Sequence, residues 1–123
     1  MAYNNAIRFY PETIRTRAFG SISGTYAPIG AATASSSNNS YALLHPARQF
    51  LLQNFTDVTL TYSWDGVNDH LQLPSMQSLI DDVTTNHTST GGAFAMPQGQ
   101  IIYVKGAPSL GQTNLTAFFG AGV

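Results

Sequence analysis

The chain has 123 residues, which fits one domain with its own core, and the absence of cysteine excludes disulfides and thiolate metal sites. Its net charge of −1 provides no long-range attraction to nucleic acid, and no run approaches the roughly 18 apolar residues of a membrane span. Direct contact with nucleic acid and a membrane partner are therefore not expected.

The first 17 residues are expected to form an extended arm outside the sheet. They lack a regular hydrophobic period, and Pro11 blocks a continuous helix. They also lack an apolar run of signal-peptide length, so we expect a protein made in a cytosol-like compartment. Most of the basic residues and several aromatic ones lie here, which makes the arm a candidate contact with a neighbouring subunit, and a solvated tail is the alternative. The candidate contact residues are Arg8, Phe9, Tyr10, Arg15 and Arg17.

Beyond residue 17 the hydrophobic period is two, which is the pattern of half-buried β-strands. It is clearest over residues 58–64, where apolar and aromatic residues alternate with threonine and serine. Turn-forming residues separate the runs, and residues 30–40 are expected to form a flexible loop. The sequence therefore predicts an all-β fold, an antiparallel β-sandwich or jelly-roll-like barrel, with residues 18–123 as a single domain. Further strands are expected at 48–54, 70–74, 100–105 and 113–119, and weaker candidates lie at 18–23, 41–44, 78–83 and 93–96.

The stretch YSWDGVNDHLQLP, residues 62–74, allows two interpretations, a hairpin turn and a metal site. Asp-Gly between two alternating runs is a strong hairpin signal, because glycine adopts positive φ and Asp and Asn side chains bond to nearby backbone. A calcium loop needs oxygen ligands at alternate positions and a Glu at its twelfth position, and no Glu follows here. The spacing favours a turn above a buried Trp64, and no metal is expected. The turn residues are Asp65, Gly66, Asn68 and Asp69.

No part of the sequence has the spacing of a catalytic or cofactor site. His45, His70 and His87 are far apart, and the chain contains no Gly-x-Ser-x-Gly elbow. The adjacent carboxylates of Asp81 and Asp82 would point to opposite faces of a strand and cannot act as a glycosidase pair by themselves. We therefore expect no enzyme, no catalytic residue and no cofactor.

Charge is the unusual feature of the composition. Charged residues make up 9% of the chain, against roughly 25% in ordinary soluble domains. The polar surface must therefore consist of Ser, Thr, Asn and Gln. A free monomer usually keeps charge on its surface, whereas a subunit enclosed by neighbours does not need it. The composition favours an assembled subunit, and lectin-like or secreted β-domains with the same bias are the alternative.

Five segments follow one another along about residues 18–119: AFGSISGTYAPIG, HPARQFLLQNFTDVTLTYSWDGVNDHLQLP, DDVTTN, GQIIYVKG and GQTNLTAFFG. In this order they resemble a recurrent group of small virion proteins of tailed bacteriophages. The likeness is strongest over QNFTD (53–57) and SWDGVND (63–69). The resemblance implies a small β-sandwich that assembles in rings or lattices at the head–tail neck, in the tail or on the capsid. It supplies no catalytic residues, and the loop at 30–40 is longer than the resemblance leads us to expect.

Composition and resemblance together predict a non-enzymatic structural subunit of a tailed-phage virion, a ring component of the head–tail connector or neck. The expected partners are copies of the chain and other virion proteins, namely portal, adaptor, tail or capsid proteins. The expected location is the virion, assembled in the host bacterial cytoplasm. One alternative is a capsid decoration (cement) protein, and another is a carbohydrate-binding β-domain in which Tyr62, Trp64 or Tyr103 stacks on a sugar. The alternation places Tyr62 and Trp64 on the buried side, which disfavours the sugar-binding domain.

Overall fold

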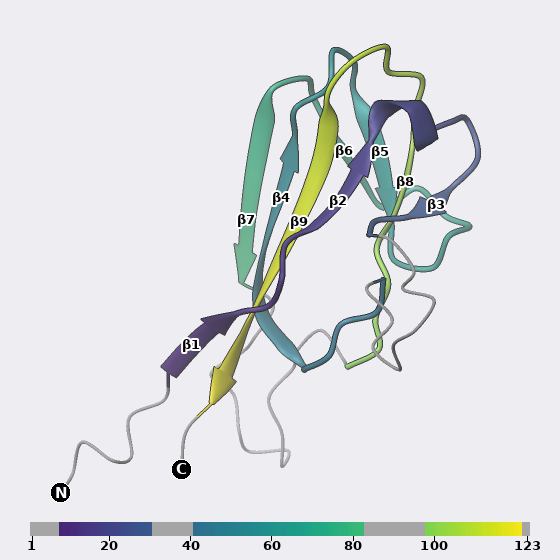
Figure 1. The fold of residues 1–123 in the computed structure, drawn as a ribbon. Helices are drawn as coiled ribbons and strands as arrows, with labels where there is room; N and C mark the ends of the chain where they lie inside the picture. The colour runs from purple at the N-terminus through teal and green to yellow at the C-terminus, as the bar shows by residue number, and fades with distance from the viewer. Residues whose placement is uncertain (1–7, 31–40, 83–97, 122–123) are drawn as a thin grey trace, which may run out of the picture.

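The computed structural model describes residues 8–30, 41–82 and 98–121, which form a β-sandwich (Figure 1). Two antiparallel sheets pack against each other, and the only helical element in these ranges is a short 3-10 turn, η2 (Phe19–Ser21). The prediction of an all-β antiparallel sandwich is confirmed.

The first sheet is built around the long strand β9 (Gln112–Ala121). One side of β9 pairs with β4 (Ala47–Asn54), and β7 (Gln77–Asp82) pairs with the outer side of β4. The other side of β9 pairs with two short strands in succession, β1 (Arg8–Pro11) and β2 (Arg15–Ala18). This sheet therefore ends at β7 on one edge and at β1 and β2 on the other (Figure 1).

The second sheet is smaller and has the strand order β3, β8, β5, β6. Its strands are β3 (Ala27–Pro28), β8 (Tyr103–Lys105), β5 (Leu60–Ser63) and β6 (Leu71–Leu73). From β4 onward the chain changes sheet repeatedly, because β5 and β6 follow β4 and β8 precedes β9. Neighbouring strands thus come from distant parts of the sequence, and the fold depends on long-range pairing.

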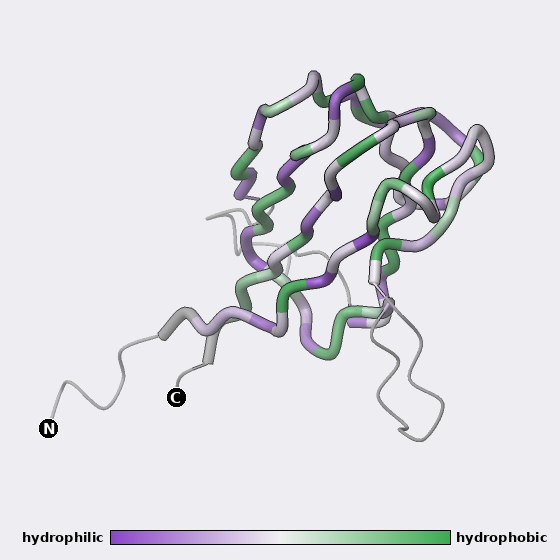
Figure 2. Tube along the Cα trace, turned by 45° about the horizontal axis from the view of Figure 1, so that its top comes forward, coloured by the Kyte–Doolittle hydropathy of each residue, from purple (hydrophilic) through white to green (hydrophobic). Residues whose placement is uncertain are grey.

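The core lies between the two sheets. Phe50 and Leu52 of β4 are 1% and 0% exposed, and they face the fully buried Leu60 and Tyr62 of β5. Hydrophobic and hydrophilic residues alternate along the strands of the first sheet (Figure 2) because successive side chains point to opposite faces. Each large apolar side chain that is fully buried stabilises the fold by roughly 1.5–3 kcal/mol.

Most predicted strands are present, with shorter bounds in places. The runs at 48–54, 58–64, 70–74, 78–83 and 113–119 correspond to β4, β5, β6, β7 and β9. The run at 100–105 yields only the three residues of β8. Residues 19–21 form η2 in place of a strand, and residues 41–44 are not part of a strand. The candidate at 93–96 and most of the loop at 30–40 lie outside the described residues.

The predicted boundary between an N-terminal arm and the domain is wrong for residues 8–17. Tyr10 of β1 pairs with Phe119, and Arg15 of β2 pairs with Leu115, so both segments belong to the first sheet. Pro11 is tolerated because it ends an edge strand, where a missing N–H costs little. Hydrophobic periodicity did not indicate β2 because its buried residue is a charged arginine, Arg15.

Candidate functional site

The described outward-facing side chains of β2, β9, β4 and β7 carry almost no charge. Strand register and alternation place three rows of side chains on this face, across β2, β9, β4 and β7. Phe118, on the same face, is half-buried. Among these side chains Asp82 alone carries a charge. We call these three rows of side chains the outer face. The rows are Thr16–Asn114–Gln53–Ser78, Thr116–Leu51–Ile80 and Phe118–Gln49–Asp82.

Ile80 is the most exposed apolar residue of the outer face. Its side chain is 65% exposed, and it lies beside the half-buried Leu51 of β4. The strand that carries it, β7, pairs only with β4 among the described strands. An edge strand of six residues with an exposed aliphatic side chain is a surface on which another chain can pack or pair.

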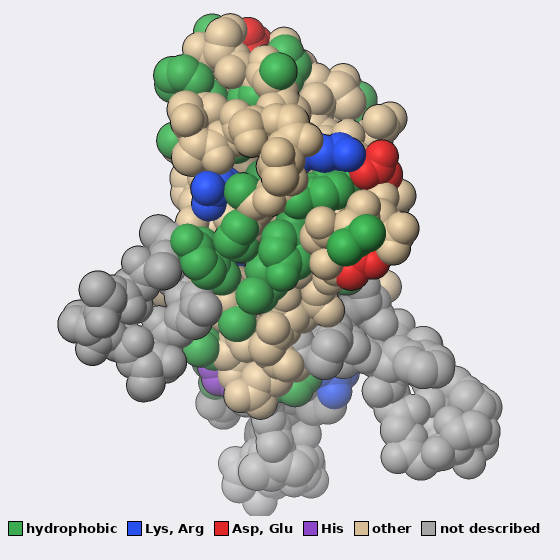
Figure 3. Space-filling view, turned by 90° about the vertical axis from the view of Figure 1, so that its right-hand side faces the viewer, with side chains coloured by type: hydrophobic (Ala, Val, Ile, Leu, Met, Phe, Trp, Pro, Cys, Tyr) green, Lys and Arg blue, Asp and Glu red, His purple; other side chains and the backbone are tan. Residues whose placement is uncertain are grey.

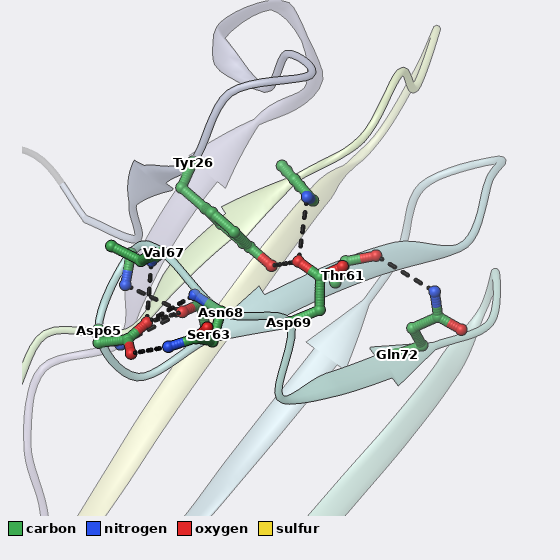
Figure 4. Close-up of polar contacts among 10 residues, drawn as sticks. Tyr26, Thr61, Ser63, Asp65, Val67, Asn68, Asp69 and Gln72 are labelled. Atoms are coloured by element: carbon green, nitrogen blue, oxygen red, sulfur yellow. Dashed lines mark hydrogen bonds and ion pairs between the residues drawn. The ribbon is translucent and has the colours of Figure 1, made fainter.

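The turn after β5 is held together by the Asp65 carboxylate. Oδ1 of Asp65 accepts hydrogen bonds from the backbone N–H groups of Val67 at 2.8 Å and Asn68 at 2.9 Å, and from the Ser63 hydroxyl at 2.8 Å (Figure 4). The Asn68 amide donates to Oδ2 at 2.7 Å. These hydrogen bonds hold the pKa of Asp65 well below its usual range, and those from the backbone N–H groups of Asn68 and Val67 contribute most. Gly66 has a φ of +77°, as an Asp-Gly turn requires.

Asp69 links this turn to the neighbouring strands and does not bond its own loop. Its Oδ1 accepts from the Tyr26 hydroxyl at 2.5 Å and lies 3.0 Å from Lys105 Nζ (Figure 4). Partial desolvation and the adjacent Asp69 carboxylate raise the pKa of Tyr26 to about 12. These contacts join the β5–β6 turn to Tyr26, next to β3, and to Lys105 of β8. Figure 3 shows hydrophobic side chains gathered in the middle of the side of the molecule that carries β3 and β8, with charged ones at its margin.

The QNFTD motif is a second side-chain-bonded turn. The Asn54 amide donates to the carbonyl oxygens of Val58 at 2.9 Å and Leu73 at 2.8 Å, and its Oδ1 accepts from the Thr56 N–H and hydroxyl. Asp57 accepts from the hydroxyl and the N–H of Ser109, and these bonds lower its pKa. The polar side chains of QNFTD, like those of the turn after β5, therefore fix loops.

The five predicted contact residues have different environments. Arg15 is only 4% exposed, so it is not available for contact with another subunit. Arg17 donates to the carbonyl oxygens of Ser21 and Pro28, both at 2.9 Å. Tyr10 is 39% exposed and packs on Phe119 with ring centroids 5.6 Å apart. The backbones of Arg8 and Phe9 lie in β1, and their side chains lie outside the described part of the structure.

No sequence pattern indicated the buried charge cluster centred on Glu12. Glu12 Oε1 lies 3.0 Å from Arg15 Nη2 and accepts from the Leu44 N–H, while Oε2 accepts from the His45 N–H at 2.8 Å and lies 3.0 Å from His45 Nδ1. Arg15 Nη2 also donates to Ala42 O at 2.7 Å. The cluster joins the link between β1 and β2 to residues 42–45. The single Glu of the chain was its only sequence signal.

A groove of about 390 Å³ opens between the two sheets on the side of β6 and β7. One wall comes from β4 and β7, and the other from the β5–β6 turn. Trp64 was expected to be buried; it packs against the core but is only half-buried, and it lines this groove. The six lining residues are Phe50, Trp64, His70, Leu71, Leu79 and Asp81.

The described residues contain no group of three or more His, Asp or Glu side chains placed to hold a metal ion. His45 bonds Glu12 and His70 accepts from the Trp64 N–H, whereas His87 lies outside the described ranges. No helix in the described ranges is long and apolar enough to cross a membrane. Comparisons of the chain with protein-family models, curated proteins and solved structures found no match.

Proposed function

We propose that the chain is a non-enzymatic structural subunit of a tailed-phage virion, a ring component of the head–tail connector or neck. The observation that carries the proposal is the outer face of the first sheet, where Asp82 is the only charged side chain in the three described rows and Ile80 is 65% exposed. The resemblance of the sequence to small virion proteins supplies the identity of the assembly.

Physical reasoning connects such a face to assembly. The cores of protein interfaces are depleted of charge, and two sheets can pack face to face. Burying the exposed part of Ile80 would stabilise an interface by roughly 1–2 kcal/mol per copy. Contacts between unlike faces of successive copies close into a ring when the rotation fits, and each copy repeats the contribution.

The expected partners follow from this placement. The outer face of one copy would pack against a different face of the next copy, and portal, adaptor, tail or capsid proteins would contact the remaining surface. A capsid decoration protein would use the same face for packing and differs in its position on the particle.

An antibody against the chain, applied to particles of the phage that encodes it, tests the proposal by electron microscopy. We expect label at the junction of head and tail, at one site per particle. Label spread over the head would show that the chain is a capsid decoration protein and not a neck component. Absence of the chain from purified particles, checked by mass spectrometry, would contradict a virion function altogether.

A further inference from the structure

We propose that the groove between β7 and the β5–β6 turn binds the pyranose ring of a neutral sugar. Phe50 and Leu79 form an apolar wall on the side of the first sheet. Leu71 forms the apolar wall on the side of the second sheet. The volume, about 390 Å³, lies within the range of small-molecule sites, which are mostly apolar with a few placed polar groups. This function is independent of the proposed assembly role.

The polar groups of the groove have a defined hydrogen-bonding character. The backbone N–H of Trp64 donates to His70 Nδ1 at 2.9 Å, so the neutral imidazole carries its proton on Nε2. Neither His70 Nε2 nor the indole N–H of Trp64 bonds to another described residue. The Asp81 carboxylate likewise accepts no hydrogen bond from the described residues. The residues that line the groove thus bring two N–H donors and one anionic acceptor that are not paired with other described residues.

The aromatic wall of the groove is fixed in place. The Trp64 ring meets Phe50 edge to face at 5.7 Å and 69°, and meets His70 at 6.0 Å and 79°. The Gln100 amide holds the Trp64 carbonyl oxygen at 2.6 Å. A pre-positioned aromatic ring loses little entropy when a ligand binds.

The combination of groups selects among ligand classes. A basic side chain would pair with Asp81 and leave the two N–H donors without an acceptor. A purely apolar ligand would remove water from all three polar groups, which is costly when no hydrogen bond replaces it. A pyranose has hydroxyls that both donate and accept, and a C–H face that packs on apolar and aromatic carbon. Of the three ligand classes, a pyranose alone can bond both the N–H donors and the Asp81 carboxylate and also pack on the apolar walls.

The groove and the outer face lie on opposite faces of β7. Leu79 and Asp81 line the groove, whereas Ile80 is exposed and Asp82 lies within reach of Gln49 on the other face, at 3.5 Å. Alternation along the strand therefore supplies a matched pair of carboxylates. Asp81 belongs to the proposed site, and Asp82, its neighbour in sequence, does not.

Trp64 is the chain's single tryptophan, so its fluorescence reports directly on the groove. The full chain is titrated with the methyl glycosides of glucose, galactose, mannose and N-acetylglucosamine, each up to about 50 mM, since an isolated sugar ring is expected to bind with a millimolar Kd. L-Argininamide and cyclohexanol serve as the cationic and apolar probes. We expect a saturable change with at least one pyranoside and a weaker response to both other probes.

The variants then locate the binding. Asp81→Asn should weaken the sugar about tenfold, the factor that one charge-assisted hydrogen bond of typical strength supplies. Asp82→Asn should leave the Kd unchanged, and circular dichroism should show both variants folded. The proposal is overturned if no pyranoside gives a saturable response, if Asp81→Asn binds as well as the parent, or if L-argininamide or cyclohexanol binds as tightly as the best sugar.

Discussion

Glu12 Oε1 lies 3.0 Å from Arg15 Nη2, and the two side chains are 2% and 4% exposed beside β9. The pair sits inside a segment whose sequence pattern predicted a detached arm. Because each charge is buried, the pair is stabilising only while both partners and their backbone contacts are present. Residues 8–18 are therefore an integral edge of the sandwich.

Removing one member of this pair should unfold the chain at a much lower temperature. Arg15→Ala leaves the Glu12 carboxylate buried without its guanidinium partner, which costs about 3–5 kcal/mol. A melting curve followed by circular dichroism should show a fall of more than about 10 °C. Arg48→Ala is the matched control, because Arg48 is half-buried on β4 and its side chain makes no hydrogen bond to the described residues. Equal melting temperatures for the two variants would show that the buried pair does not stabilise the edge.

The turn that leads into β9 requires a glycine at position 111. A Cβ added to Gly111 would lie 1.9 Å from the carbonyl oxygen of Phe55, and its φ is +90°. Gly99 has nearly the same φ, +88°, but a Cβ added there would meet no atom within 4 Å. Gly99→Ala should therefore cost about 1–2 kcal/mol for the backbone alone, and Gly111→Ala clearly more. Urea denaturation measures both, and a Gly111→Ala variant no less stable than Gly99→Ala contradicts the close packing of this turn.

Acid should weaken the turn after β5. The pKa of Asp65 is lowered in the folded state, so its contribution is complete above the ordinary carboxyl pKa of about 4 and is lost as pH falls further. The urea midpoint of the parent should therefore drop below pH 4 more steeply than that of Asp65→Asn, which cannot titrate at this position. Parallel pH profiles for the two proteins would mean that the carboxylate bonds of Asp65 do not stabilise the folded state.

The central strands were predictable from the sequence because their inward-facing residues are apolar. Phe50 and Leu52 alternate with Leu51 and Gln53, and the period alone places β4. The first two strands were not predictable this way, since the inward position of β2 is Arg15 and its partner is the only Glu of the chain. Nothing local to those residues indicates that they pair.

The two candidate surfaces depend on register, which a single sequence does not provide. The outer face follows from pairing β2, β9, β4 and β7 across as many as about 100 positions of sequence. The groove brings residue 50 together with residues 64–71 and 79–81. The alternation correctly put Trp64 against the core, but the strand ends one residue earlier, at Ser63, and the ring reaches the open side of the sandwich.

The mass of the purified chain in solution tests the assembly account most directly. Light scattering should give a species several times heavier than the 13.2 kDa subunit, and Ile80→Lys, which puts a charge in the middle of the outer face, should shift it toward the subunit mass. Val67→Lys, at a site 77% exposed on the β5–β6 turn, is the control and should keep the parent mass. A parent that stays at 13.2 kDa at the highest attainable concentration, or an Ile80→Lys variant with the mass of the parent, would contradict the account.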